Sequence, residues 1–352
     1  MILNEIDKII ASHYKECEYP VCIVQSREWG TSRPLEGLTV LDATPCFRNS
    51  LVKYRALIAA GANFVLGLAD GYPHDKNIAQ LLADNGIKIV HSTEQQSLNV
   101  DVILDCAASF SHWKARLGVV ELTRSGVPKY AGTKQPVFVA DGGAIKKIET
   151  CLGTGDGYYR AMRHLGYSDW QGKKLVIFGS GKVGSGLLVY AVRHGAQATV
   201  VTQPQSVTPK VRQLATEIID CANVDAVVTA VSQAYAVVTA TGVAGALAHP
   251  ALSQALINSS AILANMGVED EYGPDMPAAR VLNNKMVLNF MLDEPTHLKY
   301  IDATMALHNE GIIYLLSHPD AARLINPPVA VEERILDITR RNGCITAELN
   351  MI

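Results

Sequence analysis

The sequence predicts an α/β protein made of two doubly wound parallel-sheet domains with an interdomain cleft. Three observations favour this class. Short apolar runs alternate twice along the chain with longer helical segments, which is the pattern of βαβ units. The chain has 352 residues, too many for one ordinary core. A glycine-rich turn follows an apolar strand near the middle. We expect residues 1–151 with 293–352 to form a substrate or cap domain, and residues 152–292 to form a nucleotide-binding domain.

The first half of the chain contains one alternation of strands and helices. Its apolar runs have the length of buried strands, and Gly61 and Gly86 are placed to end the two intervening helices. The segment 126–143 is rich in Gly and Pro, which indicates loops around one strand. The expected order is strand 38–42, helix 49–60, strand 62–67, helix 75–84, strand 87–91, strand 100–105, strand 137–140 and a long helix at 147–166.

The second half repeats the alternation and ends in another long helix. Its expected order is strand 173–178, helix 187–194, strand 198–202, further helix and strand steps within 224–242, helix 251–256, strand 261–267, strand 286–290 and helix 296–316. We expect the long helices near 153–166 and 296–316 to cross between the domains as hinges. A ligand would then lie in the cleft between the domains.

Composition excludes several classes of protein. Apolar residues make up 48% and charged residues 18%, which suits large buried cores rather than extended disorder. A net charge of −3 offers no basic field for nucleic acid or anionic lipid. No apolar run is long enough for a membrane span, and the start lacks the basic region of a signal peptide. We therefore expect a cytoplasmic homo-oligomer that acts on a small molecule, without a nucleic-acid or membrane partner.

The seven cysteines are scattered, and none forms a CxxC pair. The pattern favours reduced and mostly buried thiols. No Cys or His cluster has the spacing of metal ligands, so no metal site is expected.

The strongest local signal is Gly179-Ser180-Gly181-Lys182-Val183-Gly184, a GxGxxG motif between a strand and a helix. Gly179 suits a tight turn, Gly181 lets the backbone approach a diphosphate, and Gly184 lets helix and strand pack closely. The helix N-terminus favours the negative charge of a diphosphate. This context predicts Rossmann-like domains and a bound dinucleotide. The alternative is a tight turn that binds no ligand.

The sequence leaves the choice between NAD and NADP open. Dinucleotide sites commonly place an acid roughly 20 residues after the turn, where it binds the ribose hydroxyls. Here that strand ends in Thr202 and Gln203. Thr202, Ser206 and Lys210 could bind a 2′-phosphate, or Thr202 or Gln203 could bind the ribose of NAD.

Two later strand ends are also candidate cofactor contacts. Thr241-Gly242 and Asn265-Met266-Gly267 each follow an apolar strand. Ligands of open parallel sheets bind beyond the carboxyl ends of the strands. Each segment taken alone could equally be an ordinary turn.

The order of these motifs resembles that of the S-adenosylhomocysteine hydrolase family. The resemblance extends from about Asp105 to residue 316. The segments that carry the resemblance are GKKLVIFGSGKVGSGLLVYAVRHGAQATVV, VVTATGV, AILANMGVEDEY and MVLNF with THLKYIDATMALHNE. The resemblance implies bound NAD that oxidises the ribose 3′ carbon of the substrate and is recycled in place. It also implies that Asn289 contacts the cofactor, and that Asp105, Glu149 and His297 occupy functional positions.

The chain departs from the family at most catalytic positions. The family's early His corresponds to Pro45, its Lys to Ile145 with Lys146 shifted by one residue, and its later His to Val268. Its Cys corresponds to Thr154, and the acid of the second cofactor strand to Thr202. The resemblance therefore implies a divergent member with altered substrate chemistry.

Four residues are candidates for catalysis, and each also has an ordinary structural explanation. Asp105 ends a strand and is expected to face the cleft, but could instead stabilise a turn. His297 precedes the last long helix and could donate or accept a proton there, but could instead be a capping or surface residue. Lys146 and Glu149 could polarise a hydroxyl, or could lie on a solvated helix face.

Three functions remain open from the sequence. The first is an NAD(P)-dependent enzyme that resembles S-adenosylhomocysteine hydrolase and oxidises a small metabolite or nucleoside. The second is a dehydrogenase of the 2-hydroxyacid type, with His297 as the acid–base residue and a releasable cofactor. The third is a catalytically inactive NAD-binding regulator.

Overall fold

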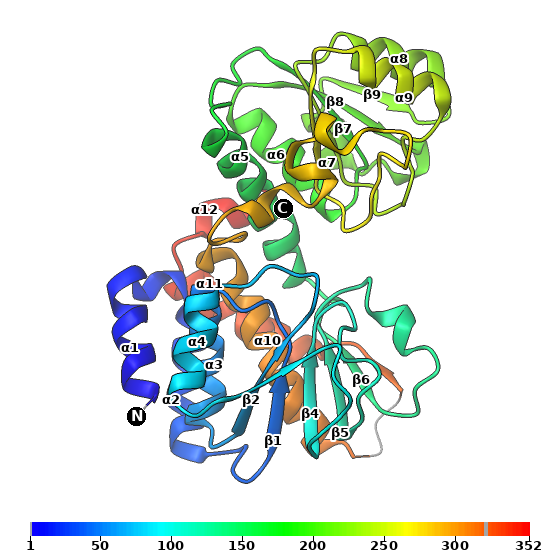
Figure 1. Cartoon of the computed structure of the whole chain (residues 1–352). Coiled ribbons are helices and arrows are strands. Elements are labelled where there is room, and N and C mark those ends of the chain that lie inside the picture. The colour runs from blue at the N-terminus through cyan, green and yellow to red at the C-terminus, as the bar shows by residue number, and fades with distance from the viewer. Residues whose placement is uncertain (1, 320–322) are drawn as a thin grey trace. The chain divides into compact units, whose positions relative to one another are not determined.

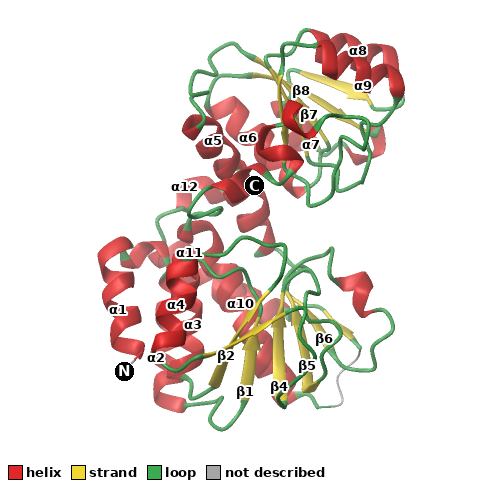
Figure 2. Cartoon of the chain, viewed as in Figure 1, coloured by secondary structure: helices red, strands yellow, loops and turns green. Residues whose placement is uncertain are grey.

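The computed structural model describes residues 2–319 and 323–352, and its chain divides into two compact units (Figure 1). Unit 1 comprises Met1–Ile148 and His297–Asn350, and unit 2 comprises Glu149–Thr296 and Met351–Ile352. Each unit contains one parallel sheet flanked by helices (Figure 2). The predicted α/β class with two Rossmann-like domains is confirmed.

Unit 1 is built on a seven-stranded sheet in the order β12-β6-β5-β4-β1-β2-β3. Its first six strands, taken in chain order, show the 3-2-1-4-5-6 arrangement of a doubly wound sheet. The order therefore reverses between β1 and β4, where ligands bind in such sheets. The strands are β1 Thr39–Asp42, β2 Asn63–Leu68, β3 Lys88–His91, β4 Val100–Asp105, β5 Ala115–Glu121, β6 Val137–Val139 and β12 Leu324–Ile325.

The helices of unit 1 come from both ends of its sequence. Asp75 caps α4 by accepting hydrogen bonds from two backbone N–H groups of the first turn. Asp302 on α10 likewise accepts the N–H groups of Val21 and Cys22 in the first turn of α2, which joins the two ends of the chain. The helices are α1 Ile2–His13, α2 Pro20–Ser32, α3 Leu51–Ala59, α4 Lys76–Asp84, α10 Leu298–Ser317, α11 Val329–Asn342 and α12 Thr346–Leu349.

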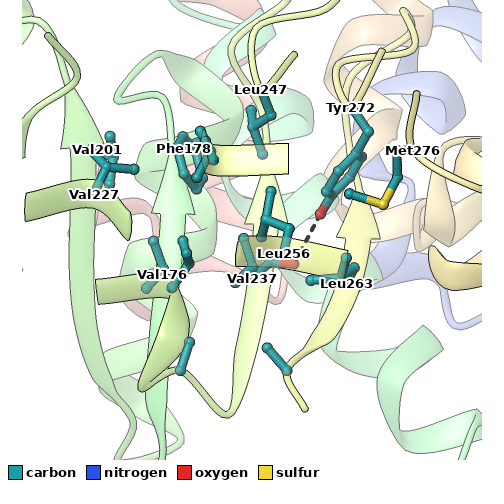
Figure 3. Close-up of a cluster of buried hydrophobic side chains, with 14 of the residues drawn as sticks. Val176, Phe178, Val201, Val227, Val237, Leu247, Leu256, Leu263, Tyr272 and Met276 are labelled. Atoms are coloured by element: carbon teal, nitrogen blue, oxygen red, sulfur yellow. Dashed lines mark hydrogen bonds between the residues drawn. The ribbon is translucent and has the colours of Figure 1, made fainter. Parts of the chain in front are cut away.

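Unit 2 has a five-stranded sheet in the order β11-β10-β7-β8-β9, the 3-2-1-4-5 arrangement of the same fold. Helices α8 and α9 cover an apolar core that includes Val227, Val237 and Leu256 (Figure 3). Buried Tyr272 donates a hydrogen bond from its hydroxyl to the Ala264 carbonyl. The strands are β7 Lys174–Phe178, β8 Gln197–Thr202, β9 Glu217–Asp220, β10 Ala236–Thr239 and β11 Ile262–Asn265. The helices are α5 Thr154–His164, α6 Lys182–Arg193, α7 Pro209–Leu214, α8 Val224–Ser232 and α9 Pro250–Asn258.

Two expected elements differ in the structure. The predicted strand at 286–290 is wrong, because Leu288–Met291 forms a 3-10 helix. Positive φ angles at residues 283–285 bend the chain there, so only an isolated bridge joins Val287 to Asn265. The predicted helix at 147–166 begins as a π-helix at Ile148–Gly153 and continues as α5. Within the described part of the chain, no helix is both long and apolar enough to cross a bilayer.

Candidate functional site

The turn between β7 and α6 has the geometry that its glycines predict. Gly179 has a φ of +99°, and a Cβ there would lie 2.5 Å from the Ala240 carbonyl oxygen. A Cβ on Gly184 would overlap the carbonyl oxygen of Gly179. A Cβ on Gly181, in contrast, would meet no described atom within 4 Å. Two glycines thus allow close packing of the backbone, whereas the third faces open space.

Helix α6 begins directly at this open position. Gly181 is its N-cap residue and, as a glycine, has no side chain with which to cap the first turn. Lys182 and Val183 occupy that turn and are partly exposed. The N–H groups at the start of a helix and the positive end of the helix dipole favour an anion at such a terminus.

A cavity of about 620 Å³ lies at the carboxyl ends of β7, β8 and β10. It lies where the strand order of unit 2 reverses, between β7 and β10. No Lys or Arg is among the residues that line it, all of which are described. The lining residues are Phe178, Gly179, Ser180, Gly181, Val201, Thr202, Gln203, Ser206, Cys221, Val224, Val227, Ala240, Thr241, Val243, Ala246, His249 and Leu252.

The end of β8 is held against the glycine-rich turn by hydroxyl groups. The Ser180 and Thr202 hydroxyls are 2.8 Å apart, and Ser180 also donates to the Ser206 carbonyl oxygen at 3.2 Å. Thr202 is buried, whereas Gln203 is exposed. The side of the cavity formed by β8 is therefore neutral and polar.

Sequence reasoning missed Glu271, which organises the loop after β10. Its buried carboxylate accepts hydrogen bonds from the Thr241 N–H at 2.9 Å, the Thr241 hydroxyl at 2.8 Å and the Gly242 N–H at 2.7 Å. A Cβ on Gly267 would overlap this carboxylate. The acidic run 269–271 was visible in the sequence, but only the fold shows which acid turns inward.

Asn265 and Asn289 differ in how many of their side-chain amide atoms have hydrogen-bond partners in the protein. Asn265 accepts from Thr239 and from the Gly267 N–H, and donates to the carbonyl oxygens of Glu269 and Lys285. Asn289 donates to the Pro295 carbonyl at 3.0 Å, but its buried Oδ1 has no partner among the described residues. Asn265 thus supports the loop, and Asn289 offers an unused acceptor. The cofactor contacts of both stay predictions.

The corresponding edge of unit 1 carries a buried ion pair that sequence reasoning also missed. Lys53 on α3 contacts the Asp42 carboxylate at the end of β1, and both side chains are fully buried. Burial lowers the pKa of Lys53, and the negative charge of Asp42 opposes that shift. On α10, buried His308 donates from Nε2 to the Val120 carbonyl oxygen at 2.8 Å. Burial holds the pKa of His308 well below its usual value, so the ring is neutral.

Asp105 lies at the carboxyl end of β4, and its side chain is fully buried. Its carboxylate accepts from the N–H groups of Cys106 and Phe110 and from the Tyr130 hydroxyl. Glu121 lies beside it in the register of β4 and β5 and is also buried. Burial and the charge of Glu121 raise the pKa of Asp105 to about 7. Its catalytic role stays a prediction.

Glu121 holds an unusual turn after β4. It accepts the N–H groups of Ala107 and Ala108 at 3.0 Å each, and it also bonds Thr123. Both alanines have positive φ angles, +56° and +54°, which side chains rarely adopt. The carboxylate therefore stabilises a backbone conformation that is unfavourable by itself.

The other three catalytic candidates divide between the units. Lys146 is buried in unit 1, and His297 is the partly exposed N-cap residue of α10 in the same unit. Glu149 is partly exposed in the π-helix of unit 2. Within the described chain, no group of three His, Cys, Asp or Glu side chains could hold a metal ion.

Comparison with solved structures shows the fold. The chain resembles a dipicolinate synthase subunit from Bacillus halodurans at 12% identity and a TM-score of 0.51, over 80% of this chain and 98% of that one. A second similarity is to the TT0316 protein from Thermus thermophilus, with 13% identity, a TM-score of 0.43, and 83% and 99% of the two chains covered. No protein-family model and no curated protein matches the sequence.

Proposed function

We propose that unit 2 binds a nicotinamide dinucleotide through the turn between β7 and α6. The observation that carries this proposal is the contrast among the three glycines. Gly179 and Gly184 are packed against backbone, while Gly181 leaves open space at the N-terminus of α6. That combination suits a diphosphate, which needs backbone N–H donors and room to approach them.

The residues around the cavity fit the remaining parts of such a cofactor. Ser180, Thr202 and Gln203 offer hydroxyl and amide groups to the adenosine ribose. Asn289 is not among the residues that line the cavity, but its unpartnered Oδ1 is an acceptor that suits an amide such as the carboxamide of nicotinamide. A 2′-phosphate adds about two negative charges, and no cation lines the cavity, so we propose NAD rather than NADP.

We further propose that the chain is an enzyme of the S-adenosylhomocysteine hydrolase type with altered substrate chemistry. The bound dinucleotide would supply a hydride acceptor for a small metabolite or nucleoside. Asp105, whose raised pKa lets it keep a proton near neutral pH, and His297 are the groups we assign to proton transfer. Lys146 and Glu149 are the remaining candidates for orienting the substrate.

A dinucleotide-binding regulator without catalysis is the second candidate. One observation favours it: the carboxylates of Asp105 and Glu121 are buried, and both already accept several hydrogen bonds from the protein. Carboxylates with these hydrogen bonds can stabilise a turn even if the protein binds no substrate.

Two measurements test the proposal. Mass spectrometry of small molecules released from the denatured protein should find NAD, and calorimetric titration should show tighter binding of NAD than of NADP. A Gly181→Ala variant should keep its fold and bind NAD at least tenfold more weakly, because the added methyl group enters the open space. Absence of heat with either nucleotide would refute the dinucleotide site.

Activity then separates the enzyme from the regulator. Screening nucleosides and hydroxy acids for absorbance at the nicotinamide band should identify a substrate. His297→Ala and Asp105→Asn should abolish turnover while NAD binding persists. A cofactor that exchanges freely during turnover would instead indicate a dehydrogenase of the 2-hydroxyacid type. Binding without turnover on any substrate would support the regulator.

A further inference from the structure

The cysteines are less uniformly buried than the sequence indicates. Cys22, Cys46 and Cys151 are buried, but the other four are partly or fully exposed. Two of these four lie together although they are far apart in sequence. Cys17 belongs to a short 3-10 helix at Glu16–Glu18, and Cys344 follows α11 directly after Gly343.

Backbone and side-chain contacts join the two residues. The N–H of Cys344 donates to the carbonyl oxygen of Cys17 at 3.1 Å. Their thiols are also within hydrogen-bonding reach of each other. The hydrogen bond between the two backbones and the contact between the two thiols hold the residues side by side, as a disulfide requires.

The solvent can reach this pair. Cys344 is exposed and Cys17 is partly exposed. Both residues belong to unit 1, so bridging them requires no change between the units. Access for an oxidant and the proximity of the two residues favour a disulfide, and its rate then depends on how readily the thiolate forms.

We propose that Cys17 and Cys344 are a redox modification site, and that their reversible disulfide clamps the two ends of the chain in unit 1. The bridge would link the segment before α2 to the segment between α11 and α12. Every element of unit 1 that lies between these cysteines in sequence would then be enclosed in one covalent ring. Cross-linking of distant residues stabilises a fold because it restricts the unfolded chain.

A hydroperoxide is a sufficient oxidant for this reaction. The Cys344 thiolate attacks one oxygen of hydrogen peroxide, the O–O bond breaks, and the released hydroxide takes up a proton to give water. The product is a sulfenic acid at Cys344. The Cys17 thiol then loses its proton and its sulfur attacks the Cys344 sulfur, and the S–O bond breaks to release a second water. Two thiols lose two electrons in total, and the peroxide gains them.

The surroundings of Cys344 set the pH dependence of this reaction. Burial and the hydrogen bond with Cys17 raise the pKa of Cys344 to about 11, while the nearby Lys299 opposes the shift. Since the thiolate is the reactive form, oxidation should be slow at neutral pH. Its rate should rise about tenfold for each pH unit between pH 8 and 10.

The decisive experiment uses the wild-type full-length protein. The protein is treated with hydrogen peroxide, its remaining thiols are alkylated, and its peptides are mapped without reduction. We expect a linked Cys17–Cys344 peptide that disappears after dithiothreitol treatment. Thermal unfolding of unit 1 should shift upward by roughly 5 °C on oxidation.

Three serine variants complete the test. Cys17→Ser and Cys344→Ser should abolish both the linked peptide and the thermal shift. Cys221→Ser removes an exposed thiol in unit 2 and should leave both unchanged. Failure to recover the linked peptide from oxidised wild-type protein overturns the proposal. An oxidised form no more stable than the reduced form also overturns it. Neither result depends on whether unit 2 binds a dinucleotide.

Discussion

The carboxyl edges of the two parallel sheets share a topology but differ in what fills them. In unit 2, the strand-order reversal between β7 and β10 opens onto a cavity, and Gly181 leaves space at a helix N-terminus. In unit 1, the equivalent reversal between β1 and β4 has a cavity of only about 10 Å³, lined by residues such as Thr44 and Cys106, and the protein's own charges are packed at this edge. Asp42, Lys53 and Asp105 are all fully buried there.

This difference indicates that the carboxyl edge of a doubly wound sheet can be occupied in two ways. Backbone N–H groups and helix N-termini meet at this edge and favour negative charge there. Unit 2 leaves that favourable field open, whereas unit 1 places its own carboxylates in it. Two sheets of the same topology can therefore differ in the side chains at this edge.

The largest expected effect concerns the internal charges of unit 1. Lys53→Met leaves Asp42 buried without its cation, which should destabilise unit 1 by about 3–5 kcal/mol. The double variant Asp42→Asn/Lys53→Met removes both charges and should recover more than half of that loss. Urea unfolding followed by circular dichroism measures both. A loss below about 1 kcal/mol in the single variant would show that water reaches the pair.

Unit 2 should respond to a change in packing rather than in charge. Gly184→Ala places a methyl group against the carbonyl oxygen of Gly179, and should destabilise unit 2 by about 3 kcal/mol. The matched Gly181→Ala variant should leave the melting temperature within about 1 °C, because its methyl group meets no described atom. Calorimetry and NAD titration of both variants test this. Equal destabilisation by the two substitutions would contradict the assigned roles of the glycines.

These contrasts also show which features the sequence could predict. The glycine-rich turn was predictable because its strand, turn and helix are contiguous, so local spacing determines its geometry. Thr202 and Gln203 at the end of β8 followed from the same spacing. The strand at 115–121 was missed because Gly118 interrupts its apolar run. The apolar segment at 286–290 forms a 3-10 helix because the left-handed residues 283–285 turn the chain.

The buried charges could not be predicted from local patterns. Asp105 meets Glu121 only through the pairing of β4 with β5, and Asp42 meets Lys53 only when α3 packs on the sheet. Glu271 was one of several acids in a short run, and its inward orientation depends on the loops around it. Each of these contacts requires tertiary structure, so the sequence indicated Asp105 but not its buried neighbour Glu121.

A third prediction follows from the raised pKa values in unit 1. Burial raises the pKa of Asp105 to about 7 and that of Asp302 to about 6. The unfolded chain releases these protons near pH 4, so the folded state binds more protons between pH 4 and 7. The contribution to stability is therefore fully present below about pH 4, and it is lost as the pH rises through 6 and then 7.

The expected slope is a loss of about 1.4 kcal/mol for each pH unit and each group, and other titrating groups add to it. Urea unfolding of unit 1 from pH 4 to 7 measures this slope, to which Asp302 contributes up to about pH 6 and Asp105 up to about pH 7. Carboxyl chemical shifts in nuclear magnetic resonance report the two pKa values directly. A chemical-shift titration that places both groups near pH 4 would contradict the prediction.

The smallest expected effect concerns the turn that Glu121 holds in unit 1. Ala107 has a φ of +56° and donates its N–H to Glu121. Ala107→Gly keeps that hydrogen bond and removes the steric conflict of the left-handed conformation, so it should stabilise unit 1 by about 0.5–1 kcal/mol. The matched control is Ala83→Gly in the exposed face of α4, which should destabilise by about 1 kcal/mol. Opposite signs from the same substitution would show that the carboxylate holds the backbone against its own preference, whereas destabilisation at both positions would show that the turn costs little.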